Sequence, residues 1–367
     1  MKTKAQNKVL IDAAENGLVE MVRESLQERL CDVDCKNKNG ETPLMLAAYN
    51  GHKDIVDILI SKKCKLNIKS KYGESALLRA AANNHKDIVS TLLAHKCNVD
   101  IQCSLGVTPL LFAASDGHKD IAAILIRHNC NLDLRDYCGF TAVMKAAERG
   151  HKDIVNLLVI HDCKMDFQCK IGWTALMHAA KGNYKDIVDT LVKNNCNLDL
   201  QNALGETALM IAVMKGHNDV VDVLISHKCN LNLQNKYGFN ALMCALGSNQ
   251  KDIAELMIRN HCDLELKVNG RMNALLLAVG RNMHDISALI IVQRYLNQNW
   301  DRRKALMLVL VGSNYLVPSS LPTTAAEGGG QVVLSPVRLQ RNDAALMTSC
   351  EKVLCDMSLV KRIMRYI

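Results

Sequence analysis

The sequence contains no long run of apolar residues. No segment of the 367-residue chain approaches the ~18 uninterrupted apolar residues that a membrane helix needs, and the first stretch, MKTKAQNKVLIDAAENG, has no apolar core of signal-peptide length. We therefore expect a soluble protein without membrane insertion, located in the cytoplasm or the nucleus. Its 15 cysteines should then be reduced rather than joined as disulfides.

Catalytic motifs and clustered positive charge are absent as well. The chain has no G-x-x-x-x-G-K-[ST] phosphate loop, no G-x-G-x-x-G, no H-E-x-x-H and no G-x-S-x-G. We therefore expect a non-enzymatic protein without a cofactor. The net charge is +8, but nine Lys and Arg against five Asp and Glu in residues 301–367 account for half of it. The rest of the excess positive charge is spread over residues 1–300 and forms no basic face with interleaved aromatic residues. We therefore expect no nucleic-acid binding.

In place of such motifs, the sequence has a repeat of 33 residues. Its clearest copy runs from Asn39 to Lys71, NGETPLMLAAYNGHKDIVDILISKKCKLNIKSK. One glycine recurs at Gly40, Gly73, Gly106, Gly139, Gly172, Gly205 and Gly238. One cysteine recurs at Cys31, Cys64, Cys97, Cys130, Cys163, Cys196, Cys229 and Cys262. A fixed period of this length indicates a solenoid.

Each repeat carries the signals of two short helices. Thr42 followed by Pro43 is typical of a helix start, and Gly51 can take the left-handed conformation that ends a helix. Asp54 then lies in the first turn of a second helix, where its charge meets the positive end of the helix dipole. Helices of about ten residues are shorter than the ~12–15 residues at which an isolated helix is marginal in water. The repeats must therefore stack on one another.

The T-P-L, A-A, N-G-H, D-I-V and L-N elements of this copy resemble the ankyrin repeat, over about residues 4–300. The resemblance implies an all-α repeat solenoid of stacked helix-turn-helix units with short β-hairpin loops. It also implies that the protein binds other proteins through its hairpin tips and inner helix face. The family's usual His after T-P-L is replaced by apolar residues, which we expect to pack in the core: Met45, Leu78, Leu111, Met144, Met177, Met210, Met243 and Leu276.

The organisation beyond the regular repeats is also predicted from the sequence. Residues 1–36 form a degenerate first copy, whose polar second helix is typical of an end cap, and about nine repeats occupy residues 4–300. Residues 301–316 should contain a helix, Asp301 to Gly312, that closes the open end of the stack. Residues 317–342 are typical of a flexible linker. Residues 343–367 predict a last helix, which either docks on the repeats or binds a partner.

The cysteine ladder is expected to be structural. Neighbouring repeats should lie roughly 8–10 Å apart, whereas a disulfide needs Cα atoms within about 7 Å and zinc holds its sulfur ligands at about 2.3 Å. The sequence therefore predicts small buried residues without a metal. A cysteine-based redox or metal-responsive protein remains the alternative from another class.

The candidate partner-binding residues stand out because the chain has only two Trp, eight Tyr and four Phe. We expect the residues beside the tip glycines, together with variable positions on the first helices, to contact a partner: Tyr49, Tyr72, Phe112, Tyr137, Phe140, Glu148, Arg149, Trp173, Lys181, Met214, Tyr237 and Phe239. Phe140 and an exposed Trp173 should form one apolar patch, with Glu148, Arg149 and Lys181 beside it. The alternative is that some of these rings only pack tip against tip.

The leading functional hypothesis is a monomeric scaffold that binds a protein or peptide. A variant of it is an adaptor whose C-terminal tail recruits a second component.

Overall fold

The computed structural model describes residues 2–27, 31–268, 270 and 272–298, which contain eighteen helices in successive pairs. The first helices of the pairs are α1 (Lys2–Asn16), α3 (Pro43–Asn50), α5 (Ala76–Ala82), α7 (Pro109–Asp116), α9 (Ala142–Arg149), α11 (Ala175–Lys181), α13 (Ala208–Lys215), α15 (Ala241–Gly247) and α17 (Ala274–Gly280). The second helices are α2 (Val19–Gln27), α4 (Lys53–Ser61), α6 (Lys86–Ala94), α8 (Lys119–Arg127), α10 (Lys152–Ile160), α12 (Lys185–Lys193), α14 (Asn218–Ser226), α16 (Lys251–Arg259) and α18 (His284–Gln298).

Strands are nearly absent from the described part of the chain. There, β1 (Lys267–Val268) pairs antiparallel with β2 (Met272–Asn273), and they form the one sheet. The other hairpins are tight loops closed by backbone hydrogen bonds, such as those from the Cys103 N–H to the Val107 carbonyl at 3.0 Å and from the Gly106 N–H to the Cys103 carbonyl at 2.9 Å. The predicted all-α repeat solenoid is confirmed. The segments predicted at 301–316, 317–342 and 343–367 lie outside the described residues.

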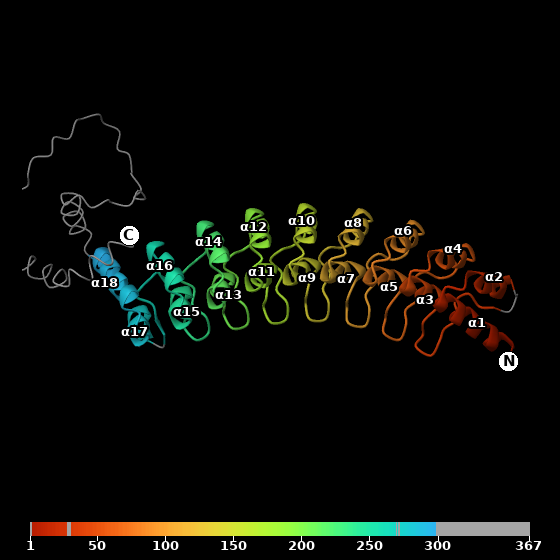
Figure 1. The fold of residues 1–367 in the computed structure, drawn as a ribbon, viewed down its shortest axis with the longest axis horizontal. Coiled ribbons are helices and arrows are strands. Elements are labelled where there is room, and N and C mark those ends of the chain that lie inside the picture. The colour runs from red at the N-terminus through yellow and green to blue at the C-terminus, as the bar shows by residue number, and fades with distance from the viewer. Residues whose placement is uncertain (1, 28–30, 269, 271, 299–367) are drawn as a thin grey trace, which may run out of the picture. The chain divides into compact units, whose positions relative to one another are not determined.

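The chain divides into two compact bodies, Met1–Ser248 and Asn249–Ile367. In the first body each first helix packs on the next first helix, and each second helix packs on the next second helix. Figure 1 shows the two rows, with the hairpin loops projecting from the row of first helices on the side away from the second helices. In the second body α18 packs on both α16 and α17.

The helix boundaries follow from residues that the sequence singled out. Thr42 Oγ1 accepts a hydrogen bond from the Met45 N–H at 3.3 Å, and Asn240 Oδ1 accepts the matching bond from Met243 at 3.0 Å. Gly51 ends α3 with φ +80°, and Asn84 takes φ +60° just after α5. Non-glycine residues also take the left-handed conformation after the second helices, as Lys63 does with φ +59°. These local predictions are confirmed.

The core consists of the apolar faces of both helix rows. The residue three places after each cap, where the family has His, is almost fully buried in α3 to α15, as predicted. The same prediction is wrong for Leu276 in α17, which is 56% exposed. Its counterpart Met243 in α15 is fully buried, and no further first helix follows α17 among the residues described.

The recurring cysteines line the core as predicted. From Cys64 to Cys262 they are buried, whereas Cys31 is half-buried. Burial raises the pKa of the buried ladder thiols to about 12, so they stay protonated at neutral pH. Within residues 2–298, less the few left undescribed, no disulfide forms and no three metal-ligating side chains meet. Over the same residues no helix is long and apolar enough to cross a membrane.

Candidate functional site

The hairpin tips of the first body are tied together by backbone hydrogen bonds. The Ser104 N–H donates to the Tyr72 carbonyl at 2.9 Å, and the Tyr137 N–H donates to the Leu105 carbonyl at 2.9 Å. The same bond recurs from tip to tip, up to that between Lys236 and Leu204. A Cβ on Gly73, which has φ +75°, would lie 2.5 Å from the Ser104 nitrogen. The recurring glycine therefore permits both the turn and the close approach of the next tip.

The residue before each tip glycine from Gly73 to Gly238 belongs to an exposed row that we call the tip ridge. Its members are Tyr72, Leu105, Cys138, Ile171, Leu204 and Tyr237. The large side chains among them are between 46% and 67% exposed. Only the two tyrosines among them were predicted from the sequence, where aromatic residues marked the tips. A search for the residue directly before each recurring glycine would also have identified Leu105, Ile171 and Leu204. Tyr137, one place earlier in its tip, is also exposed.

A second row of contacts lies at the base of the tips. Arg79 in α5 donates from Nη2 to Glu41 Oε1 at 2.5 Å and to Glu74 Oε2 at 2.7 Å. Its guanidinium carbon also lies 5.7 Å from the centre of the Tyr49 ring. Burial opposes the ionisation of Glu41, but hydrogen bonds from Asn37 and Arg79 overcome it and lower the pKa of this carboxyl. One buried cation thus joins the tip bases of two successive repeats.

The same arrangement recurs further along the row of first helices, at Phe140, Trp173 and His178, which we call the aromatic triangle. The His178 ring in α11 lies 5.1 Å from the Trp173 ring and 5.3 Å from the Phe140 ring, measured between ring centres. Arg79 and His178 therefore occupy matching positions, and their neighbours are two acids in one case and two aromatic rings in the other.

His178 is held neutral at physiological pH. Its side chain is only 6% exposed, and Nε2 is buried without a hydrogen-bond partner. Its pKa is lowered from 6.5 to about 4, chiefly by burial; Glu148 opposes this shift, and Lys181 and Lys145 add to it. His178 was not predicted from the sequence, because the candidates there were residues beside the tip glycines and variable positions on the first helices.

Two lysines flank the triangle. The Lys145 Nζ lies 3.8 Å from the centre of the Phe140 ring, and the Lys181 Nζ lies 5.3 Å from that of Trp173. Lys145 also lies 3.8 Å from Glu148. The expectation of one exposed patch of two rings is therefore corrected. Both rings are half-buried, and they meet through His178 rather than directly.

The other predicted residues lie along the same side of the first body. Glu148, Arg149 and Lys181 are exposed at the ends of α9 and α11. Tyr49 and Met214 are exposed on α3 and α13, whereas Phe112 on α7 and Phe239 at its tip base are half-buried. The structure thus brings together Phe140, Trp173 and Lys181, and it spreads the remaining residues over the other repeats.

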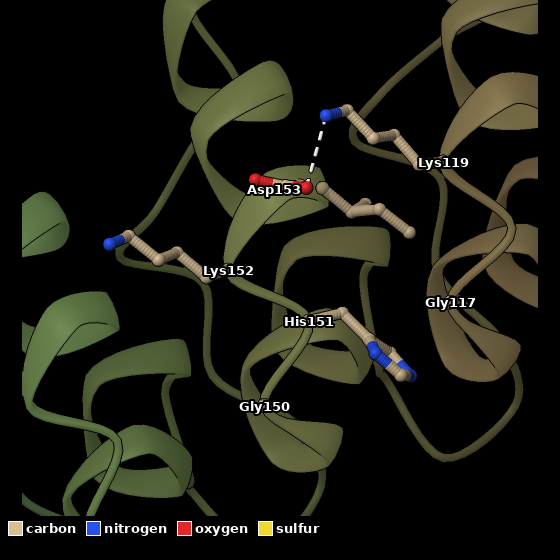
Figure 2. Close-up of a pocket in the computed structure, with 7 residues that line it drawn as sticks. Gly117, Lys119, Gly150, His151, Lys152 and Asp153 are labelled. Atoms are coloured by element: carbon tan, nitrogen blue, oxygen red, sulfur yellow. Dashed lines mark hydrogen bonds and ion pairs between the residues drawn. The ribbon is translucent and has the colours of Figure 1, made fainter.

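A shallow cleft of about 340 Å³ lies on another part of the first body, lined by Gly117, Lys119, Gly150, His151, Lys152, Asp153 and Ile154. Figure 2 shows Lys119 reaching across it to Asp153, with 3.0 Å between Nζ and Oδ2. His151 Nε2 lies 3.0 Å from the Ser115 carbonyl oxygen of the preceding repeat. Lys86 and Asp120 form the same ion pair one repeat earlier. The polar groups of the cleft therefore hold repeats together, which favours a structural role.

Comparison with known proteins supports the interpretation of the 33-residue period as an ankyrin repeat. No curated protein is found to be similar to the chain. The model of the family described as ankyrin repeats (3 copies) matches residues 10–103, 95–170, 143–235 and 176–268. These overlapping matches cover most of the described residues and more than half of the whole sequence. The chain therefore belongs to the ankyrin repeat family.

Proposed function

We propose that the protein is a monomeric, non-enzymatic scaffold that binds a protein or peptide through the tip ridge and the exposed residues of the first helices. Ankyrin repeats are in general protein-protein interaction modules, and the family is typically non-enzymatic. The buried thiols of the ladder fit this proposal better than a redox role, because a protonated thiol is a poor nucleophile. The adaptor hypothesis stays a prediction, since the tail lies outside the described residues.

The tip ridge is the observation that carries this proposal. Contiguous apolar surface on a soluble protein marks an interaction site more often than single exposed apolar residues do. The ridge has large apolar side chains on every tip but that of Cys138, where the neighbouring Tyr137 is exposed, and the tip-to-tip hydrogen bonds hold the tips in a fixed order. The bonded tips lose little conformational freedom on binding, which favours recognition by a preformed surface.

Affinity capture with the full-length protein tests the proposal. The ridge variant Leu105→Ser/Ile171→Ser should lose proteins that the unmodified protein retains. Ile160→Ser is the matched control, because Ile160 is 75% exposed at the end of α10, in the row of second helices away from the hairpin loops. The control should retain the same proteins. If the ridge variant captures them as well as the control does, the partner binds elsewhere and the proposal is wrong.

A further inference from the structure

The aromatic triangle and its two lysines form a subsite that differs from every other tip base in the described part of the chain. We call it the Trp173 subsite; its residues are Phe140, Lys145, Trp173, His178 and Lys181. We propose that this subsite binds an acidic side chain of the partner, an Asp or Glu, that stands next to an apolar residue. The inference rests on the proposed function and specifies the chemistry of the partner.

The contacts of Arg79 with Glu41 and Glu74 can be compared with the Trp173 subsite, because the residues occupy matching positions. Around Arg79 the two tip-base residues, Glu41 and Glu74, bring carboxylates to within 2.5 and 2.7 Å of the guanidinium. At the Trp173 subsite the matching tip-base residues are aromatic, so the fold supplies no carboxylate from these positions. The cations are nevertheless present, on α9 and α11. His178, which matches Arg79, is neutral, so a carboxylate from a partner would pair with Lys145 or Lys181 instead.

The charges beside the subsite favour an acid over a base. Lys145 has Glu148 at 3.8 Å, but across the residues described no carboxylate lies within 4.0 Å of the Lys181 ammonium. Arg149 and Lys215 add two exposed positive charges at the ends of α9 and α13. A charge-assisted hydrogen bond from an ammonium to a carboxylate is stronger than a neutral one, and a basic partner would meet like charges instead.

The two aromatic rings of the subsite are the reason to expect an apolar residue next to the acidic one in the partner. Phe140 and Trp173 are half-buried, so each still offers part of its face or edge to a partner. Met214 is exposed on α13, the next helix of the row, and it is polarizable and adaptable in contacts with apolar groups. Aromatic anchors next to charged groups are the usual composition of interface hot spots.

Selection from a random 12-residue peptide library displayed on phage tests this inference with the full-length protein. Peptides recovered on the unmodified protein should be enriched in Asp or Glu beside Leu, Met or an aromatic residue. Their affinity should fall at least tenfold for Lys145→Glu/Lys181→Glu. The control Lys185→Glu/Lys193→Glu makes the same change of charge at exposed positions of α12, a second helix, and should bind them unchanged.

A charge swap separates a lost contact from a damaged fold. Peptides whose acidic residue is replaced by Lys should bind Lys145→Glu/Lys181→Glu more tightly than they bind the unmodified protein. Recovered peptides that need Trp173 but show no acidic enrichment would overturn the inference and leave the scaffold proposal standing. Equal affinity for the charge-reversed variant would also overturn it. Recovery of no peptide at all would count against both.

Discussion

Arg79 and Glu41 form a buried ion pair between successive repeats, with 2.5 Å between Nη2 and Oε1 and side chains only 10% and 13% exposed. The pair is 38 residues apart in sequence, and so are His178 and Phe140. One geometric relationship between repeats is therefore used twice with different chemistry. In one place it closes an ion-pair network, and in the other it builds the Trp173 subsite.

Replacing Arg79 alone should destabilise the fold. Arg79→Leu leaves two neighbouring carboxylates, Glu41 and Glu74, without their cation, and breaking such a buried pair costs about 3 kcal/mol of unfolding free energy. Arg79→Leu/Glu41→Val/Glu74→Val should recover most of the loss, because the chain itself has Leu46 and Val107 at matching positions. Urea denaturation measures both variants. An unchanged midpoint for Arg79→Leu would show that the pair contributes nothing.

The buried His178 should make stability depend on pH. Its folded pKa of about 4 lies below its ordinary 6.5, so between these values the unfolded chain binds the proton more readily. The stabilisation is therefore complete above pH 6.5 and is lost as the pH falls towards 4. The loss should reach on the order of 3 kcal/mol, since one pKa unit corresponds to about 1.4 kcal/mol.

His178→Phe should remove this part of the pH dependence, which urea midpoints at pH 7 and pH 4.5 would measure. Burial is the main cause of the shift, with Lys181 and Lys145 adding to it and Glu148 opposing it. The control His161→Gln changes an exposed histidine at the end of α10 and should keep the dependence. Equal pH profiles for His178→Phe and the unmodified protein would show that His178 titrates normally.

The cysteine ladder should react slowly in the native protein. Thiols whose pKa is raised to about 12 by burial contain almost no thiolate at pH 7, and the thiolate is the reactive form. A thiol reagent should modify the buried ladder cysteines only after denaturant is added. Denaturation without reductant should then recover all 15 thiols of the sequence. Stoichiometric zinc or several disulfides would contradict this account.

The segment after α18 should protect the end of the second body. Leu276, Val279 and Ile291 are about half exposed, whereas Met243 and Leu246, the counterparts of the first two, are fully buried in the first body. Exposed core positions at the end of a solenoid call for a cap. Truncation after Trp300, which removes the predicted helix Asp301 to Gly312, should cause aggregation or loss of helicity. A monomeric truncated protein of equal stability would count against a capping role.

The local features of the fold were predictable from sequence, because they depend on residues a few places apart. The cap at Thr42 and the left-handed turn at Gly51 each follow from the chemistry of the residue itself. The surroundings of His178 were not predicted, because its two neighbours come from different repeats. Trp173 lies 5 residues before His178 and Phe140 lies 38 residues before it, so the Arg79 pattern of neighbours at these two offsets would have identified both. The exposure of Leu276 depends on whether another helix packs against α17, which the repeat pattern alone does not give.

Binding of a selected acidic peptide to Trp173→Ala tests the central claim most directly. Isothermal titration should show affinity weakened by about thirtyfold, or about 2 kcal/mol, with Ile160→Ser unchanged. The melting temperature should change little, because Trp173 is half-buried at a tip base rather than in the core. Unchanged affinity together with a lower melting temperature would show that Trp173 only packs against His178 and that the binding face lies elsewhere.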